Sequence, residues 1–314
     1  MKRTRPDTLE RLCGQMACMR AFELALGDLW AQGLISGELH LGIGEEGIVA
    51  GVVDHLTDGD ALALSALLNE AVMIPALSGG RWPIPLVVRA VCGGGYGDAG
   101  QHEQSLWGLL AGIPGLQVVV PSNPADAAGL MLSAIRSDDP VVFLEHKLLS
   151  DLMRASLAGD RRTNIVLDVP SEGAEGEVRR RPEPVPIGSG KVVRGGNDLT
   201  IFSLAIGVHR SLEAAGVLAE EGIETTVVDL RTVAPLDRDL ITTTATATGK
   251  VLVVDEDYET FGLSGEIAAV VAESGVDASF RRMATTTQIP YVRHLQDAVL
   301  PNVNRIVASA LSFS

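Results

Sequence analysis

The sequence predicts an α/β protein in which a mainly parallel sheet is followed by a second, smaller α/β domain. Short, almost continuous apolar runs alternate with stretches of helical periodicity, which is typical of parallel strands buried between helices. Residues 170–190 are rich in proline, glycine and charge and have little periodicity, so they separate two such series. The 314 residues are enough for two domains with cores of their own.

The first series opens with apolar residues spaced three and four apart, which predict one face of a helix. Gly33 ends this helix, and Gly79 and Gly80 stand where the C-cap of a later helix is expected. In order, we expect a helix over 8–33, a helix over 45–56, a short buried strand over 61–65, a helix over 66–78 and a strand over 85–91.

A glycine-rich turn and a helix from about Glu103 come next, then a strand over 116–121. The leucines expected to face the core from this helix are Leu106, Leu109 and Leu110. Asn123 and Pro124 are typical of an N-cap and a first helical residue, so they predict a helix to about Arg136. A further strand is expected at 141–145.

Beyond residue 190 the alternation continues and predicts the second α/β domain. Three apolar runs, at 199–206, 225–231 and 250–257, are expected to be strands separated by helices. The run SGEIAAVVAESG is expected to be a helix with Ser264 as its N-cap and Gly275 after its end.

The composition excludes two kinds of partner. A net charge of −15 argues against nucleic acid, because a phosphate backbone would be repelled by most of the molecule. The richest apolar run, residues 61–77, contains Asn69, Glu70 and Pro75, so no membrane span is expected. The basic start is followed by polar residues, and no secretory signal is expected. We therefore expect a soluble, cytoplasmic protein.

The cysteine pattern also favours a reducing compartment. Cys13, Cys18 and Cys92 form no CxxC pair, so they build neither a disulfide framework nor a four-ligand zinc site.

The segment GYGDAGQHEQS, residues 95–105, is the first candidate site. Backbone N–H groups of the turn and the positive end of the helix would face whatever binds there, which suits a phosphate or a carboxylate. His102 lies beside the helix start and could accept or donate a proton near neutral pH. A capping or solvent-facing histidine is the alternative that this local pattern leaves open.

Glu45 and Glu46 form a second candidate, adjacent carboxylates at the start of a helix after the flexible GIG. Carboxylates in a first helical turn are stabilised by the helix dipole by about 0.3–1 kcal/mol each, so the pair alone does not indicate catalysis.

The run GGGYGDAGQHEQSLWGLLAGIPGLQVVVPSNPADAAGLMLSAIRSDDPVVFLEHK is similar to the β subunit of the thiamine-diphosphate-dependent 2-oxo acid dehydrogenases. Later motifs agree in order: PIGSGKVVRGGNDLTIF, VVDLRTVAPLD, KVLVVDEDYETFGLSGEIAA and IPYVRHLQDAVLP. The likeness runs from residue 66 to the end. It implies a parallel-sheet, pyrimidine-binding-type domain over 65–169, a linker over 170–190 and a transketolase C-terminal-type α/β domain over 191–314.

The resemblance also implies roles for residues of the loop. In that family the histidine of this loop lies in the active site, near the thiazolium ring and the incoming lipoyl group, so the role falls to His102. Gly95 and Gln101 are implied to contact the cofactor. Glu103 stands where the family usually has serine, and we expect its negative charge to lie beside the site and to alter substrate choice.

Residues 1–64 resemble the opening of the α subunit of the same enzymes, as in a chimera joined near Ser65, and are expected to complete the first domain. The β-type segment with the glutamate that contacts the aminopyrimidine ring has no direct counterpart. That glutamate favours the imino tautomer from which the reactive cofactor forms. The order of predicted elements puts Glu45 in its position, with Glu46 as the next candidate.

Asp98 and Asn123 are spaced like the Gly-Asp turn and asparagine that hold magnesium diphosphate in thiamine enzymes, although the third glycine of that motif is missing. Asn123 already has a sufficient role as an N-cap. No metal site within this chain is expected, and these two residues are the alternative ligands.

The function implied is a β-like component that decarboxylates a 2-oxo acid and transfers the acyl or aldehyde unit. Thiamine diphosphate and Mg²⁺ are expected to be held mainly by an α-like partner, with a lipoyl acyltransferase as a candidate acceptor. A homodimer or an α2β2-type heterotetramer is expected, with the contact between β-like chains made through the second domain. The alternatives are a catalytically silent assembly partner or fusion remnant, a carboligase of a biosynthetic pathway, and a self-sufficient homodimer.

Overall fold

The computed structural model describes residues 6–34, 71–150, 154, 167, 169 and 176–313. The chain divides into two compact units, Met1–Ser65 and Ala66–Ser314. In the first unit the helix α1 (Pro6–Ala31) confirms the helix predicted over 8–33, and Gly33 follows it with a φ of 72°. The helix predicted over 45–56 and the strand over 61–65 lie outside the described residues. None of the described helices is both long enough and apolar enough to span a bilayer.

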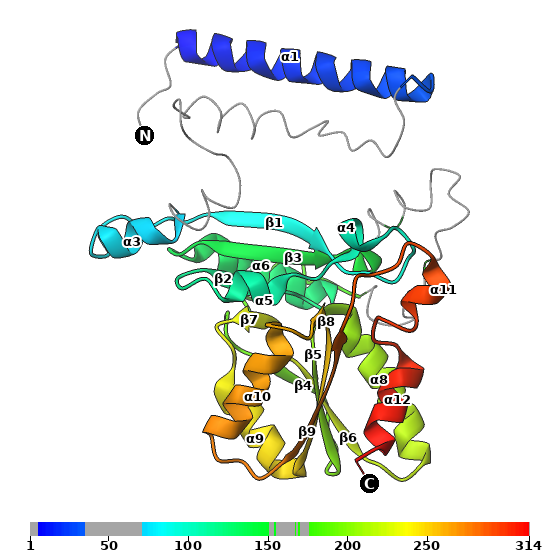
Figure 1. Cartoon of the computed structure of the whole chain (residues 1–314). Helices are drawn as coiled ribbons and strands as arrows, with labels where there is room; N and C mark the ends of the chain where they lie inside the picture. The colour runs from blue at the N-terminus through cyan, green and yellow to red at the C-terminus, as the bar shows by residue number, and fades with distance from the viewer. Residues whose placement is uncertain are drawn as a thin grey trace. The chain divides into compact units, whose positions relative to one another are not determined.

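The second unit consists of two lobes, each built on its own sheet (Figure 1). The first sheet has the strand order β1-β3-β2-β7. The elements of this lobe are α3 (Met73–Leu77), β1 (Val87–Cys92), α4 (Gly100–Glu103), α5 (Trp107–Ala111), β2 (Gln117–Val119), α6 (Pro124–Arg136), β3 (Val141–His146), the 3₁₀ helix η2 (Lys147–Leu149) and β7 (Thr232–Ala234).

The first sheet is parallel except at one edge. β1 and β2 both pair with β3 in parallel, whereas β7, which comes from much later in the chain, pairs with β2 in the antiparallel direction. Leu130 and Ala134 of α6 pack with Phe143 and its neighbours to form the core on one face. The parallel strands bring their carboxyl ends to one edge, where the glycine-rich loop begins.

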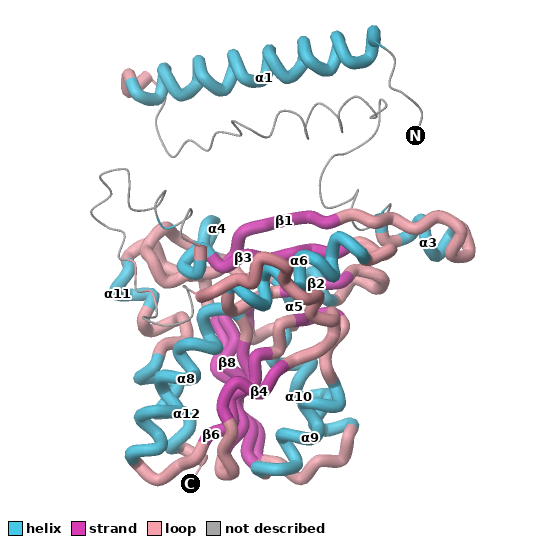
Figure 2. Tube along the Cα trace, turned by 180° about the vertical axis from the view of Figure 1, so that it is seen from behind, coloured by secondary structure: helices cyan, strands magenta, loops and turns pink. Residues whose placement is uncertain are grey.

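The second lobe is a three-layer sandwich of helices, sheet and helices (Figure 2). Its strand order is β4-β6-β5-β8-β9, parallel apart from the edge strand β4. The helices α8 and α12 cover one face and α9 and α10 the other. The bounds are β4 (Lys191–Arg194), β5 (Leu199–Ser203), α8 (Ala205–Glu220), β6 (Thr225–Asp229), α9 (Arg238–Thr248), β8 (Lys250–Tyr258), α10 (Leu263–Glu273), β9 (Ser279–Thr285), α11 (Arg293–Gln296) and α12 (Val303–Leu311).

Several local predictions are wrong at the ends of helices. The helix predicted to start near Glu103 is instead the short α4, which ends there, followed by α5 from Trp107. Leu109 is exposed, and Trp107 fills the interior in its place. The N-cap of α10 is Gly262, so Ser264 lies within the first turn of the helix.

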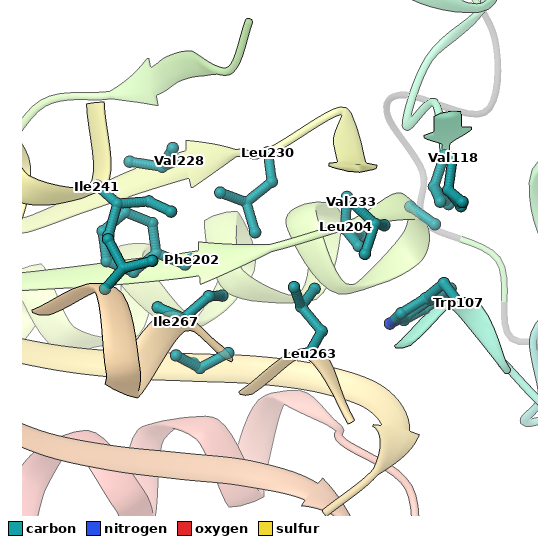
Figure 3. Close-up of a cluster of buried hydrophobic side chains, with 14 of the residues drawn as sticks. Trp107, Val118, Phe202, Leu204, Val228, Leu230, Val233, Ile241, Leu263 and Ile267 are labelled. Atoms are coloured by element: carbon teal, nitrogen blue, oxygen red, sulfur yellow. The ribbon is translucent and has the colours of Figure 1, made fainter. Parts of the chain in front are cut away.

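One hydrophobic core runs through both lobes. Trp107 and Val118 of the first lobe belong to the same cluster of buried side chains as Phe202 and Ile267 of the second. Figure 3 shows Trp107 and Val118 nearest to Leu204 and Val233, with Phe202 and Ile241 farther into the second lobe. Apolar side chains of both lobes are therefore buried against one another, in addition to the polar contacts between the lobes.

Candidate active site

The candidate site is built on the loop that leaves β1 at Cys92 and reaches α5 at Trp107. Gly93, Gly95 and Gly97 have φ values of 92°, 100° and 92°, a region that favours glycine. A Cβ at Gly93 would come within 2.1 Å of the His146 ring. The loop can follow this path only because these positions lack side chains.

Glu103 lies inside the loop, with only 1% of its surface exposed. Its Oε1 accepts hydrogen bonds from the backbone N–H groups of Tyr96, Gly97 and Asp98 at 3.1, 2.8 and 3.1 Å. Its Oε2 accepts one from Nε2 of Gln296. Burial raises the pKa of the Glu103 carboxyl above its ordinary value, although the three amides and Gln296 oppose this.

These contacts correct two expectations about the loop. The amides of Tyr96, Gly97 and Asp98 do not face an external phosphate or carboxylate, because they donate to Glu103. The Glu103 charge is not held beside an open site either, since its carboxyl points into the protein and is buried. Both corrections have one cause: the amides of the turn bind the carboxylate of Glu103, which is close in sequence, and this draws that carboxylate into the protein.

His102 precedes Glu103 and is half-buried. Its carbonyl accepts hydrogen bonds from the Tyr96 hydroxyl at 2.8 Å and from Nζ of Lys147. Lys147 also donates to the Tyr96 hydroxyl at 2.7 Å, and its Nζ lies 5.3 Å from the centre of the Tyr96 ring. Nε2 of the His102 ring is 3.1 Å from Nε2 of Gln101, so the two predicted site residues are neighbours.

Gly95, another predicted cofactor residue, is part of the buried floor of the loop. A Cβ there would come within 3.1 Å of the Arg210 guanidinium. Glu45 and Glu46 lie outside the described residues. Of the predicted site residues that the structure describes, His102 and Gln101 contact each other, whereas Gly95 lies on the buried side of the same loop against Arg210.

A buried ionic network lies beneath the loop, where the two lobes meet. Nε2 of His146 is 2.8 Å from Oε2 of Glu256, and Arg210 donates to Oε1 of Glu256 at 2.9 Å. Nδ1 of His146 accepts from the Leu148 amide at 3.2 Å, so the ring proton is on Nε2 and is donated to Glu256. Ser105 donates to the same carboxylate at 3.4 Å.

The charge of Glu256 is stabilised by this network. Burial alone would raise the pKa of Glu256, but His146, Arg210 and the Gly94 amide together hold that pKa below its ordinary value. His146 was missed by sequence reasoning, because its partner is 110 residues away and no local spacing links the two.

Two further buried acids of β8 hold the helix α5. Trp107 donates from Nε1 to Asp255 at 3.0 Å, and the Gly108 amide donates to Asp257 at 2.7 Å. Burial, with a smaller effect of Asp257, raises the pKa of Asp255 to about 7. Burial also raises the pKa of Asp257 to about 6.

Asn123 has a structural role at the start of α6. Its Oδ1 accepts from the Asp126 amide at 2.9 Å, and its Nδ2 donates to the Asp126 carboxylate at 2.7 Å. Asp126 in turn binds Arg231, with its Oδ1 2.6 Å from the guanidinium. Asp98, the other alternative metal ligand, is buried. In the described ranges no three His, Cys, Asp or Glu side chains are grouped to hold a metal ion.

Two cavities lie in the first lobe or at its border with the second lobe. One of about 190 Å³ is lined by Asn123, Glu145 and His146 among others. A wider one of about 630 Å³ lies between α5 and α10 and is lined by neither His102 nor Gln101.

The two sheets, their order and the shared core define a transketolase-like protein with two α/β lobes. Family models agree: "Transketolase, pyrimidine binding domain" matches residues 63–151 and "Transketolase, C-terminal domain" matches residues 188–306. A solved structure described as a split-gene transketolase, inactive β4 tetramer, has the same fold with a TM-score of 0.59 and 20% identity, covering 93% of this chain and 96% of that one.

The chain belongs to the family of β subunits of the thiamine-diphosphate-dependent 2-oxo acid dehydrogenases, as the sequence resemblance predicted. It is 37% identical to the β subunit of acetoin:2,6-dichlorophenolindophenol oxidoreductase of Bacillus subtilis, over 78% of this chain and 66% of that one. It is 36% identical to the β subunits of 2-oxoisovalerate dehydrogenase (79% and 71% covered) and pyruvate dehydrogenase (74% and 66% covered) of the same organism.

The match spans about two thirds of the length of these relatives. The family models begin at residue 63, so the α-subunit-like character of residues 1–64 stays a prediction.

Proposed function

We propose that the chain is the β-like component of a thiamine-diphosphate-dependent enzyme that decarboxylates a 2-oxo acid and transfers the acyl or aldehyde unit. The observation that carries this proposal is the half-buried His102, held on a fixed loop within the lobe that matches a pyrimidine-binding domain. An imidazole in that position can donate or accept a proton at a reacting oxygen.

The residues of the loop fit one side of a cofactor site. When bound, thiamine diphosphate would supply the electron sink for decarboxylation. His102 and Gln101 would offer hydrogen bonds to the reacting part of the substrate, and Gly95, packed against Arg210, would support the loop that carries them. Glu45 is the proposed carboxylate toward the aminopyrimidine ring, with Glu46 as second choice. Neither Asp98 nor Asn123 is proposed as a ligand, because Asp98 is buried and Asn123 uses its only side-chain oxygen as a helix cap.

Completion of the site falls to other chains. An α-like subunit would hold Mg²⁺ and the diphosphate, since the two carboxylates of this loop, Asp98 and Glu103, are buried and Glu103 already binds the loop amides and Gln296. A lipoyl acyltransferase is the proposed acceptor, a homodimer through residues 191–314 the proposed contact, and the cytoplasm the proposed location.

A second candidate concerns the substrate. The relatives named as acetoin oxidoreductase β subunits favour a four-carbon acyloin, cleaved or formed at the same carbon that a 2-oxo acid presents. This would make the chain part of an acyloin-cleaving enzyme or a carboligase. Parallel assays with pyruvate, a branched 2-oxo acid and acetoin separate the candidates.

The proposal is tested by calorimetric titration of thiamine diphosphate with magnesium into the chain alone, and into its mixture with an α-like subunit. We expect heat of binding only in the mixture, its loss with Glu45→Ala, and unchanged binding but lost turnover with His102→Ala. Binding to the chain alone would favour a self-sufficient homodimer. No binding in either case would favour a silent assembly partner and overturn the proposal.

A further inference from the structure

The loop between β1 and α5 contains a ring of backbone donors of the kind that binds anions. Positive φ values at Gly95 and Gly97 turn the amides of Tyr96, Gly97 and Asp98 toward one point. Successive amides arranged in this way form an anion-binding concavity, called a nest. In this chain the anion is internal, because Oε1 of Glu103 occupies that point.

The second oxygen of Glu103 is fixed from the other lobe. Gln296 of α11 is fully buried and donates from Nε2 to Oε2 of Glu103 and, at 2.8 Å, to the Pro290 carbonyl. The Gly100 amide donates to the Ile289 carbonyl at 3.1 Å. Both ends of α4, the helix that carries His102, are therefore tied to the segment 289–296.

The carbonyl of His102 completes the frame. It accepts from Tyr96 and from Lys147, both of which are buried, while Glu103 holds the amide of Tyr96. Tyr96 thus holds α4 at two points: its amide binds the Glu103 carboxylate, and its hydroxyl binds the His102 carbonyl. A change at Glu103 would release both sides of this arrangement.

We propose that Glu103 is a positioning residue for His102, and that its carboxylate fills the nest of Tyr96, Gly97 and Asp98 and so closes that nest to external anions. The carboxylate of a substrate or the diphosphate of a cofactor then has to be bound elsewhere in the assembled enzyme. The importance of positioning His102 for catalysis rests on the proposed function. The binding of the Glu103 carboxylate by the nest does not depend on that function.

The test uses the full chain without cofactor or partner. Glu103→Ala should speed the hydrogen exchange of the 96–98 amides by about tenfold or more, because charge-assisted bonds are lost. The ring resonances of His102 should broaden at the same time. Glu103→Gln keeps one acceptor without the charge and should give intermediate exchange.

Rescue by a small anion distinguishes a filled nest from a merely structural glutamate. Sodium formate added to Glu103→Ala should slow the exchange of these amides and sharpen the His102 resonances, whereas sodium chloride at equal ionic strength should not. Formate should have no effect on the wild-type chain, whose nest is already occupied. Glu145→Ala, which removes an acid of β3 whose carboxylate binds Arg89 and not the loop amides, is the matched control and should behave as wild type.

Unchanged exchange in both Glu103 variants would overturn the proposal, and so would faster exchange that formate does not reverse. If Glu103→Ala does not fold, the intermediate exchange of Glu103→Gln decides. A failed calorimetric titration would overturn the proposed function and leave these measurements unaffected, so the two failures are distinguishable.

Discussion

Glu256 carries a charge in a place where an unpaired charge would be very unfavourable. Only 3% of its side chain is exposed, and it is bonded to His146 from the first lobe and Arg210 from the second. A buried ion pair is weak evidence for net stability, but removal of one partner leaves the other buried and unpaired.

Glu256→Gln should therefore lower the free energy of unfolding by about 3–5 kcal/mol, because Arg210 loses its counter-charge in the interior. Urea denaturation followed by circular dichroism measures this loss. Glu145→Gln is the matched control: it removes the partner of Arg89 at the surface and should cost less than about 1 kcal/mol. Equal effects of the two variants would contradict the assigned importance of burial.

The stabilisation by Glu256 and its buried partners should also depend on pH. The pKa of folded Glu256 is below its ordinary value, so its stabilisation is present above the unfolded pKa and is lost as pH falls through the folded pKa. The difference in stability between wild type and Glu256→Gln should narrow below about pH 4. A difference that stays constant down to acid unfolding would show that the Glu256 charge is not the cause.

The pKa of Asp255 is shifted in the opposite direction to that of Glu256, so its effect on stability should have the opposite dependence on pH. Its pKa is raised to about 7 by burial and by the charge of Asp257. Its ionised form is thus disfavoured in the folded state, and its effect on stability becomes more unfavourable as pH rises from its ordinary pKa toward 7. Asp257→Asn should lower the pKa of Asp255, as measured by carboxyl ¹³C NMR titration. An unchanged or higher pKa would rule out the coupling.

At the scale of single elements, α6 depends on its cap. Asn123 accepts from the Asp126 amide, and Asn123→Ala should cost about 1 kcal/mol of stability. Asn123→Ser keeps a side-chain acceptor at the cap without placing a second carboxylate against Asp126, and should cost much less. Thermal unfolding of both variants checks this, and an equal loss would show that the contact of Nδ2 with the Asp126 carboxylate is what matters.

The sequence predicted α6 from Pro124 to about Arg136 because its start signals are local, and the structure confirms both bounds. The same kind of reasoning failed at Ser264, since either Gly262 or Ser264 can precede a first turn and only packing selects between them. Leu109 was placed inside for its hydrophobicity, but the larger Trp107 takes the interior position and donates to Asp255. β7 was not predicted, because three residues carry little periodicity.

For the candidate site, too, the sequence predicted local features but not contacts between distant residues. The glycine turn and its histidine are contiguous, so the sequence located the loop and His102. The role of Glu103 depends on backbone angles at Gly95 and Gly97, which a sequence pattern does not specify. The pairing of His146 with Glu256 joins distant parts of the chain and had no local signal at all.

At the scale of the whole molecule, the shared core implies that the two lobes of residues 66–314 unfold together. Trp107 is fully buried between them, and Trp107→Ala should cost about 3–5 kcal/mol. Trp82→Ala is the matched control: this side chain is 67% exposed, and its loss should change stability by less than about 0.5 kcal/mol.

Cooperativity is checked by following urea unfolding with tryptophan fluorescence and circular dichroism. The transition of the two lobes should have one midpoint by both probes, because neither lobe keeps its core when the other unfolds. Two separate transitions for the two sheets would contradict a shared core.

The crossing of β7 has a consequence for how the polypeptide could be divided. Residues 225–229 lie in the second sheet as β6, and after Leu230 and Arg231 the backbone enters the first sheet as β7, where the Val120 amide donates to the Arg231 carbonyl at 2.8 Å. A proteolytic nick in the exposed segment 176–181 would therefore not liberate two independent pieces. The carboxyl-terminal fragment would supply an edge strand to its counterpart, and the nicked halves should remain associated and reassemble by fragment complementation.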